Sequence, residues 1–344
     1  MIRKASASLT SQSEPGRLIS ICLSAVVVAA TTDEPRVLSL QGKNRDEAEA
    51  LPSGQLAPEH RTLESSLRAW VERQTKQQLG YVEQLYTFGD RNRSGIDKGT
   101  AERALAVAYL ALVREARPAG LAEASWRNWY AYFPWEDWRN GRTAVLDVIE
   151  RRLKAWAKAG PTAVRRLRKE RVEATFGFGE LGWNEERVLE RYELLFEAKL
   201  LLEAWRDCGE VVTAKHSLVP GVSMALDHRR MLATAIGRLR GKIKYRPVVF
   251  ELMPPTFTLL ELQRTVEALA GVRLHKQNFR RLVEAQGLRG DRRHQSGDGR
   301  APGAPSTLSP GGPARTARSG VASPPTGDAA LRKIQLTELY SSLA

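Results

Sequence analysis

The chain has 344 residues, of which 27% are charged, and its formal net charge is +14 at pH 7. This length accommodates two domains, and the excess of cations favours a polyanionic partner, nucleic acid above all. Two cysteines, Cys22 and Cys208, are too few for a disulfide framework or a structural zinc site, so we expect a reducing cytoplasm. Apolar runs stay shorter than the roughly 18–20 residues of a membrane helix, which argues against a membrane protein.

The N-terminal part of the sequence predicts a disordered segment followed by two strands. Residues 1–15 are rich in Ser, and we expect them to be disordered. Residues 18–30 and 36–40 indicate strands on either side of a short turn. The first run also resembles the apolar core of a secretory signal. The β-branched residues 26–28, and the Glu-Pro pair that precedes the run, favour a buried strand instead.

A helix and two more strands follow. We expect the helix over residues 62–78, with Thr62 at its cap and an apolar stripe that includes Leu67 and Val71. Residues 81–88 and 104–113 indicate the strands, separated by a loop rich in Asp, Arg and Gly.

The order of these elements, with Leu51-Pro-Ser-Gly54 before the helix, resembles a Nudix domain. Laid on the chain without a gap, the family's signature falls on Gly54, His60, Arg68, Ala69, Glu72 and Arg73. Nudix hydrolysis needs several carboxylates on one helix face to hold Mg²⁺ and activate water. Glu72 alone keeps a carboxylate, and Arg73 puts a cation where the metal would sit. We therefore expect no catalytic residue and no metal site here. For Arg68 and Glu72, the interpretation we favour is an i,i+4 surface ion pair.

The strand at Tyr81-Val-Glu-Gln-Leu-Tyr-Thr-Phe-Gly-Asp90 is similar, nearly word for word, to a stretch of the Nudix-related transcriptional regulators of NAD metabolism, the NrtR-like family. This resemblance implies that the Nudix fold serves as a sensor, with a nucleotide such as ADP-ribose in the former substrate cleft. Arg91 and Arg93 are then candidates to bind its phosphates. The alternative for both is a solvated loop.

Residues 114–216 predict a helical insertion that the shorter regulators lack. Its densest aromatic run is residues 126–138, and residues 165–171 form a basic face. We expect helices over residues 145–159, 161–175 and 184–205. Aromatic side chains interleaved with Arg can stack on bases, but a satellite core or a surface for a protein partner is the interpretation we favour.

Residues 218–242 resemble the family pattern again, and residues 225–242 look like the last helix of the Nudix domain. We assign residues 16–242 to this Nudix-like domain. Asp227 and His228 at the start of this helix suggest a metal or catalytic pair. A helix cap is the interpretation that we favour, and we expect no metal there.

Residues 250–287 predict two short helices joined by a tight turn. Thr258 and Glu261 form a capping box, and Gly271 ends the first helix. The second helix is expected from about residue 275. Its polar side carries Lys276, Gln277, Arg280 and Arg281. Such a pair is a helix-turn-helix candidate, and the alternative is a helical hairpin with a solvated basic face. The sequence of residues 239–288 resembles that of the C-terminal winged helix of the same regulators. We assign residues 243–288 to that domain.

Residues 289–344 have a low-complexity composition of Pro, Gly, Ser and Arg. In the family, the words Thr-Gly-Gly-Arg-Pro-Ala precede a final strand of the wing. A one-base shift in GC-rich codons gives residues 291–303 an allowed reading that contains those words. We therefore hypothesise that a frameshift near Leu288 replaced the wing, and the alternative is a natural basic tail.

Together these patterns predict an α/β protein: a Nudix-type α/β/α sandwich with a helical insertion, followed by a winged helix-turn-helix domain whose wing is lost. We expect a sequence-specific DNA-binding regulator of NAD-metabolism genes in the bacterial cytoplasm, associated with the nucleoid. Its expected partners are double-stranded DNA, a nucleotide effector such as ADP-ribose and a second copy of the chain, with no cofactor and no membrane. Two alternatives are a Nudix phosphohydrolase acting on ADP-ribose-like substrates and a non-catalytic protein-interaction module.

Overall fold

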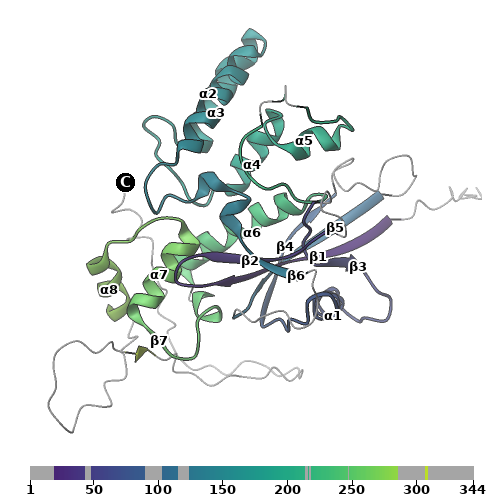
Figure 1. Ribbon diagram of the computed structural model, residues 1–344, viewed down its shortest axis with the longest axis vertical. Coiled ribbons are helices and arrows are strands. Elements are labelled where there is room, and N and C mark those ends of the chain that lie inside the picture. Colours follow the sequence, from purple (N-terminus) through teal and green to yellow (C-terminus); the bar gives the residue numbers. More distant parts are fainter. Residues whose placement is uncertain are drawn as a thin grey trace, which may run out of the picture.

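The computed structural model describes residues 19–42, 48–89, 103–114, 124–213, 216, 218–246, 248–285 and 307–308. A mixed sheet lies at the centre of the molecule, with helices on both of its faces and a small helical unit at one end (Figure 1). Among the helices of the described part, none combines the length and the apolar character needed to cross a bilayer.

The strands of the central sheet are β1 (Ile19–Ala30), β2 (Pro35–Leu40), β3 (Ser53–Gln55), β4 (Tyr81–Phe88), β5 (Arg103–Leu112) and β6 (Ala124–Asn128). Their order is β4-β5-β1-β2-β6, and β3 pairs with β1. The central pair, β1 and β5, is parallel, and the other pairings are antiparallel. The four expected strands are confirmed. β6 differs from expectation, because it lies inside the segment predicted as a helical insertion and pairs with β2.

Helices cover the two faces of the sheet because its central strands are apolar on both sides. Leu23 and Val27 of β1 face helix α1 (Leu63–Thr75), which packs Leu67 and Val71 against them. Val26 of β1 faces the opposite way, into the cluster that includes helix α6 (His228–Tyr245). The expected α/β/α sandwich is therefore present. Helix α1 begins at Thr62, whose side chain accepts a hydrogen bond from the Ser65 N–H.

The insertion contributes helices α2 (Ala144–Ala159), α3 (Thr162–Phe176), α4 (Val188–Glu197) and α5 (Leu202–Asp207). Helices α2 and α3 lie side by side and project from the body of the molecule (Figure 1). The single helix expected over residues 184–205 is wrong. The helix is interrupted between α4 and α5, where Lys199 has a left-handed backbone with a φ of 52°.

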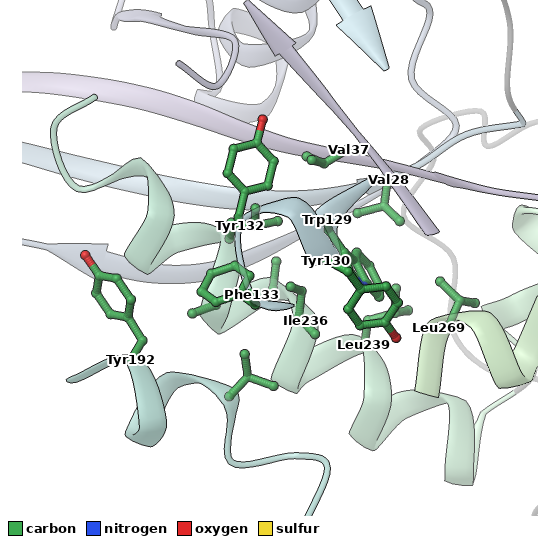
Figure 2. Close-up of a cluster of buried hydrophobic side chains, with 14 of the residues drawn as sticks. Val28, Val37, Trp129, Tyr130, Tyr132, Phe133, Tyr192, Ile236, Leu239 and Leu269 are labelled. Carbon is green, nitrogen blue, oxygen red and sulfur yellow. The ribbon is translucent and has the colours of Figure 1, made fainter. Parts of the chain in front are cut away.

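The aromatic run of the insertion belongs to the main core. It forms two short 3-10 helices, η1 (Trp129–Ala131) and η2 (Pro134–Glu136). Figure 2 shows Tyr130 and Phe133 beside Ile236 and Leu239 of α6. Trp129 and Trp135 are 0% exposed, so the base-stacking interpretation is wrong for these two side chains.

The C-terminal unit contains a 3-10 helix, η3 (Val248–Glu251), strand β7 (Phe257–Thr258), helices α7 (Leu259–Ala270) and α8 (Lys276–Ala285), and strand β8 (Thr307–Leu308). Helix α7 begins at the predicted capping box and ends at Gly271, whose φ is 77°. β8 pairs antiparallel with β7. This short strand lies within the tail that we predicted to be of low complexity, and the frameshift stays a hypothesis.

The two cysteines occupy different surroundings. Cys22 is half-buried in β1, and burial raises the pKa of its thiol. Cys208 is exposed, directly after α5.

Candidate nucleic-acid interface

Helix α8 presents one apolar and one polar face. Phe279 and Val283 are buried against the rest of the C-terminal unit. The four predicted DNA-contacting residues are all exposed on the same helix: Lys276, Gln277, Arg280 and Arg281. Their spacing places them on one side, because residues three and four apart share a helix face. Guanidinium and amide groups arranged in this way can form paired hydrogen bonds to base edges in a major groove.

The turn between α7 and α8 is held by Glu267, a carboxylate that is only 4% exposed. Its Oε1 accepts hydrogen bonds from the Leu274 N–H at 3.1 Å and from Gln263 Nε2 at 2.9 Å. Its Oε2 accepts one from Arg273 Nη1 at 2.8 Å. Gln263 Nε2 also donates to the Leu274 carbonyl at 3.1 Å. These bonds fix the angle at which α8 leaves α7. Glu267 was not among the residues predicted from the sequence, although a carboxylate between the apolar residues Val266 and Ala268 was a usable signal.

The Nudix-like positions on and before α1 are used by the chain itself. Gly54 has no room for a side chain, because a Cβ atom there would lie 2.2 Å from the Trp70 ring. Trp70 Nε1 donates to the Gln55 carbonyl at 2.8 Å, and the guanidinium of Arg73 lies 4.7 Å from the centre of the Trp70 ring. The glycine and the cation thus hold an indole in place.

The predicted ion pair between Arg68 and Glu72 is wrong. Arg68 pairs with Glu64 at 2.7 Å and donates to the Gly80 carbonyl at 3.0 Å and to that of Leu79. Glu72 is exposed and accepts a 3.4 Å hydrogen bond from the Gln78 amide. Arg68 therefore ties α1 to the segment that leads into β4.

Two other predicted positions of the cleft, His60 and Ala69, lie before and on α1. Ala69 and His60 are half-buried, and His60 Nδ1 is a buried atom without a hydrogen-bond partner. Arg91 and Arg93 lie outside the residues that the structure describes. Within the described ranges, His, Cys, Asp and Glu side chains form no group of three or more that could hold a metal ion.

Asp227 and His228 serve the packing of α6. His228 is buried, and its Nδ1 accepts a 3.0 Å hydrogen bond from the Leu51 N–H. Burial, with a further contribution from the charge of Arg206, lowers the pKa of His228 to about 4, so the ring is neutral near pH 7. Asp227 stands at the cap position of α6, but its side chain makes no capping hydrogen bond and pairs instead with Arg230 at 3.5 Å. The cap interpretation is therefore wrong for the Asp227 carboxylate.

A surface cavity of about 500 Å³ lies between α4 and α6. Arg238 and Arg246 are exposed on its α6 side, and Glu190 is exposed on its α4 side. Helix α6 and the sheet separate this cavity from α1, the helix that carries the Nudix-like positions. This cavity was not predicted from the sequence, because its walls come from segments that are distant along the chain.

Comparisons with known proteins identify the C-terminal unit. Residues 249–302 match the family model of the NrtR DNA-binding winged helix domain, which covers α7 and α8. The ADPR responsive transcriptional repressor NtrR of Acinetobacter baylyi is 39% identical over 80 residues. That stretch is 23% of this chain and 31% of the repressor, so the match spans about a third of the relative's length.

Several solved structures are similar at low identity. NrtR of Shewanella oneidensis in complex with a 27mer DNA is 18% identical, with 84% of this chain and 92% of that chain covered and a TM-score of 0.48. A MutT/nudix family protein from Enterococcus faecalis is 16% identical, with 80% and 84% covered and a TM-score of 0.47. The NUDIX domain of Shewanella oneidensis NrtR in complex with ADP ribose is 20% identical, with 35% and 79% covered and a TM-score of 0.28.

Proposed function

We propose, from the premise that residues 249–302 form an NrtR DNA-binding winged helix domain, that the protein is a sequence-specific DNA-binding transcriptional regulator. The observation that carries this proposal is the exposed polar face of α8 within the matched segment. The net charge of +14 supports it, because a basic protein is drawn to the phosphates of a duplex.

The chemistry of α8 suits the reading of base edges. An Arg side chain can donate two hydrogen bonds to guanine, and a Gln side chain can pair with adenine, each contact discriminating by ~1–3 kcal/mol. Arg280, Arg281 and Gln277 supply these groups, and Lys276 supplies a cation for a nearby phosphate. As a homodimer, the protein would read the two halves of a palindromic site with two such helices.

The body of the molecule, residues 16–242, is proposed as the sensor of a nucleotide. The relative that matches over 80 residues is an ADPR responsive repressor, which supports ADP-ribose as the effector and repression as the mode of regulation. Arg91 and Arg93 are the candidates to bind the diphosphate. The resemblance to regulators of NAD metabolism makes genes of NAD metabolism the proposed targets.

The proposed sensor binds its nucleotide without cleaving it. Hydrolysis by a Nudix site needs several carboxylates on α1, and this chain has Ala69 and Arg73 at two of those positions. Arg73 is engaged on the Trp70 ring, so the helix presents a cation instead of a carboxylate. Incubation of the purified protein with ADP-ribose and Mg²⁺ should release no AMP. Metal-dependent release of AMP would favour the phosphohydrolase alternative.

The DNA-binding proposal is tested by selection and substitution. Genomic fragments retained by the purified protein would provide the operator, and fluorescence anisotropy would then measure its affinity. The double charge reversal Arg280→Glu with Arg281→Glu should weaken the affinity by about 100-fold or more, from the loss of two base-reading groups.

A matched control is Lys154→Glu with Lys158→Glu, which reverses two exposed cations on α2 and so changes the net charge equally. This control should lose far less affinity. An operator affinity that is unchanged by the α8 variant, or reduced equally by both variants, would remove α8 as the reading element. The addition of ADP-ribose should change the operator affinity of the wild-type protein.

A further inference from the structure

The C-terminal end of α7 is held by hydrogen bonds from the body of the molecule. A helix leaves its last carbonyls without partners inside the helix. Here the Ala268 carbonyl accepts a hydrogen bond from Tyr130 Oη at 2.7 Å, and the Leu269 carbonyl accepts one from Arg240 Nε at 3.0 Å. The Gly271 carbonyl accepts one from the Trp138 N–H at 2.7 Å. Two of these donors belong to the aromatic run and the third to α6, so three separate groups of the body hold one helix end.

A buried ion cluster stands behind these contacts. Glu136 is 1% exposed, and its Oε2 accepts hydrogen bonds from Arg240 Nη1 at 2.7 Å and Arg191 Nη2 at 2.9 Å. Its Oε1 accepts one from Arg191 Nε at 2.6 Å. Two buried guanidinium groups thus share a single carboxylate. Arg191 Nη1 also donates to the Asn184 carbonyl at 2.8 Å, and Arg240 Nη1 also donates to the Glu185 carbonyl at 3.0 Å.

The excess positive charge of this cluster suits the end of α7. A helix C-terminus carries a partial negative charge, and Arg240 lies against it. Gly271 shows how close the approach is, because a Cβ atom there would lie 2.4 Å from the Glu136 carbonyl oxygen and 2.8 Å from Arg240 Nη2. A side chain at position 271 would separate the helix from the cluster.

The contacts form an unbroken series from the body to the exposed face of α8. Arg240 and Tyr130 hold the end of α7, and Glu267 of α7 holds the turn that sets the direction of α8. A guanidinium group imposes a fixed, planar set of hydrogen bonds, so it restricts orientation more strongly than an apolar contact of the same size.

We infer that Tyr130, Glu136 and Arg240 are positioning residues for DNA reading, which hold α8 in one orientation relative to the body of its own protomer. This inference rests on the proposed function. It predicts that α8 keeps its orientation relative to the body of its own protomer when a nucleotide binds.

Arg240→Met is the principal test, since it removes the guanidinium while leaving Glu136 paired with Arg191. Arg229→Met is the matched control. Arg229 is also on α6, is 2% exposed and pairs with Glu203 at 3.2 Å, but its partners lie within the body. Both variants lose a buried guanidinium, so both should lower the stability of the body. Measurements are made at a temperature where circular dichroism shows each full-length variant to be folded.

Arg240→Met should weaken the affinity for the selected operator by about tenfold or more and leave the affinity for ADP-ribose within about twofold. It should also raise hydrogen exchange of the amides at the end of α7 by about tenfold. Arg229→Met should change neither the operator affinity nor that exchange by more than about twofold. Tyr130→Phe, which removes one hydroxyl, should give a smaller effect of about fivefold in the same direction.

Equal losses of operator affinity in Arg240→Met and Arg229→Met would overturn the inference, because they would reflect destabilisation alone. Unchanged exchange at the end of α7 in Arg240→Met would overturn it as well. If the wild-type protein bound no duplex DNA, the proposed function would fail. The exchange measurements would then still decide whether Arg240 and Tyr130 fix the C-terminal unit to the body.

Discussion

Helices α1 and α8 both turn cationic side chains away from the apolar core, but the two helices use them differently. On α1, Arg68 binds Glu64 and two backbone carbonyls, and Arg73 lies on the Trp70 ring. On α8, Lys276 and Arg281 extend from an exposed face. A polar face that bonds to its own chain stabilises the fold, whereas one that projects into solvent is open to a partner. Substitutions in the α1 region should therefore change stability, and those on α8 should change binding.

The largest expected effect is on the free energy of unfolding at acidic pH. It acts through His228, which holds the segment that precedes β3 and α1. His228 holds the Leu51 N–H just before β3, and its pKa is about 4 in the folded protein. In the unfolded chain a His titrates near 6.5, so the unfolded state binds the proton first. The contribution of His228 to the free energy of unfolding is therefore fully present above about pH 6.5. It falls by roughly 3 kcal/mol as the pH drops to about 4.

Urea unfolding followed by Trp fluorescence at about pH 7.5 and about pH 4.5 measures this loss. His228→Asn should remove the His contribution, because the Asn amide oxygen accepts the same hydrogen bond without titrating. An identical pH dependence in wild type and His228→Asn would show that other groups account for the acid sensitivity.

A smaller loss is expected from Gly54→Ala. The added methyl group would collide with the Trp70 ring, and overpacking of this kind costs ~1–3 kcal/mol. The free energy of unfolding in urea measures the cost. Gly54→Ala combined with Trp70→Leu should recover part of it, because the smaller side chain leaves space for the methyl group. A single variant as stable as the wild type would contradict the packing argument.

Arg68→Ala should cost about 1 kcal/mol, chiefly through the lost hydrogen bonds to the Leu79 and Gly80 carbonyls. Glu64→Ala breaks only the exposed ion pair and should cost no more than about 0.5 kcal/mol. Equilibrium unfolding of the two variants separates the contributions. Equal costs would mean that the ion pair, and not the carbonyl contacts, gives Arg68 its structural role.

The smallest stability effect is expected on α8. Gln277→Ala should leave the free energy of unfolding within about 0.5 kcal/mol of the wild-type value, because its side chain is exposed. The same substitution should weaken operator binding by about tenfold, since one base-reading amide is lost. Thermal unfolding and anisotropy on the same sample give both numbers. A stability loss comparable to that of Gly54→Ala would erase the contrast between the two helices.

The sequence predicted best those features whose partners lie within a few residues. Thr258 and Glu261 bond to each other's backbone across one helical turn, and Gly271 ends α7 through its own conformation. Interactions of this kind can be predicted from a short stretch of sequence, because both partners lie within it. The strands were predicted for the same reason, since an apolar run marks a buried strand wherever its neighbours lie.

Features that depend on distant segments escaped prediction. β6 was read as part of a helical insertion because its partner is β2, far away in the sequence. Arg68 has a Glu one turn away on either side, and the carbonyls of Leu79 and Gly80 favour the bond to Glu64. The left-handed backbone of Lys199 could not be predicted from the sequence, because residues in this conformation are usually Gly or Asn.

The residues of the candidate site also divide into those with partners nearby in the sequence, which were predicted, and those with distant partners, which were not. The exposed residues of α8 followed from helical periodicity. The cluster of Glu136, Arg191 and Arg240 joins three segments that meet only in the folded protein. Arg191 and Arg240 appear in the sequence as ordinary charged residues of amphipathic helices, and Glu136 appears as a carboxylate within the aromatic run.

The unequal surroundings of the two thiols provide a ready attachment point for a spectroscopic reporter. The thiolate is the form that reacts with a maleimide, and the raised pKa of Cys22 keeps that side chain largely protonated. A dye added at neutral pH should therefore label Cys208, which is exposed after α5. In a homodimer the two dyes would report the distance between insertions, so energy transfer between differently labelled copies would reveal whether ADP-ribose rearranges the protomers.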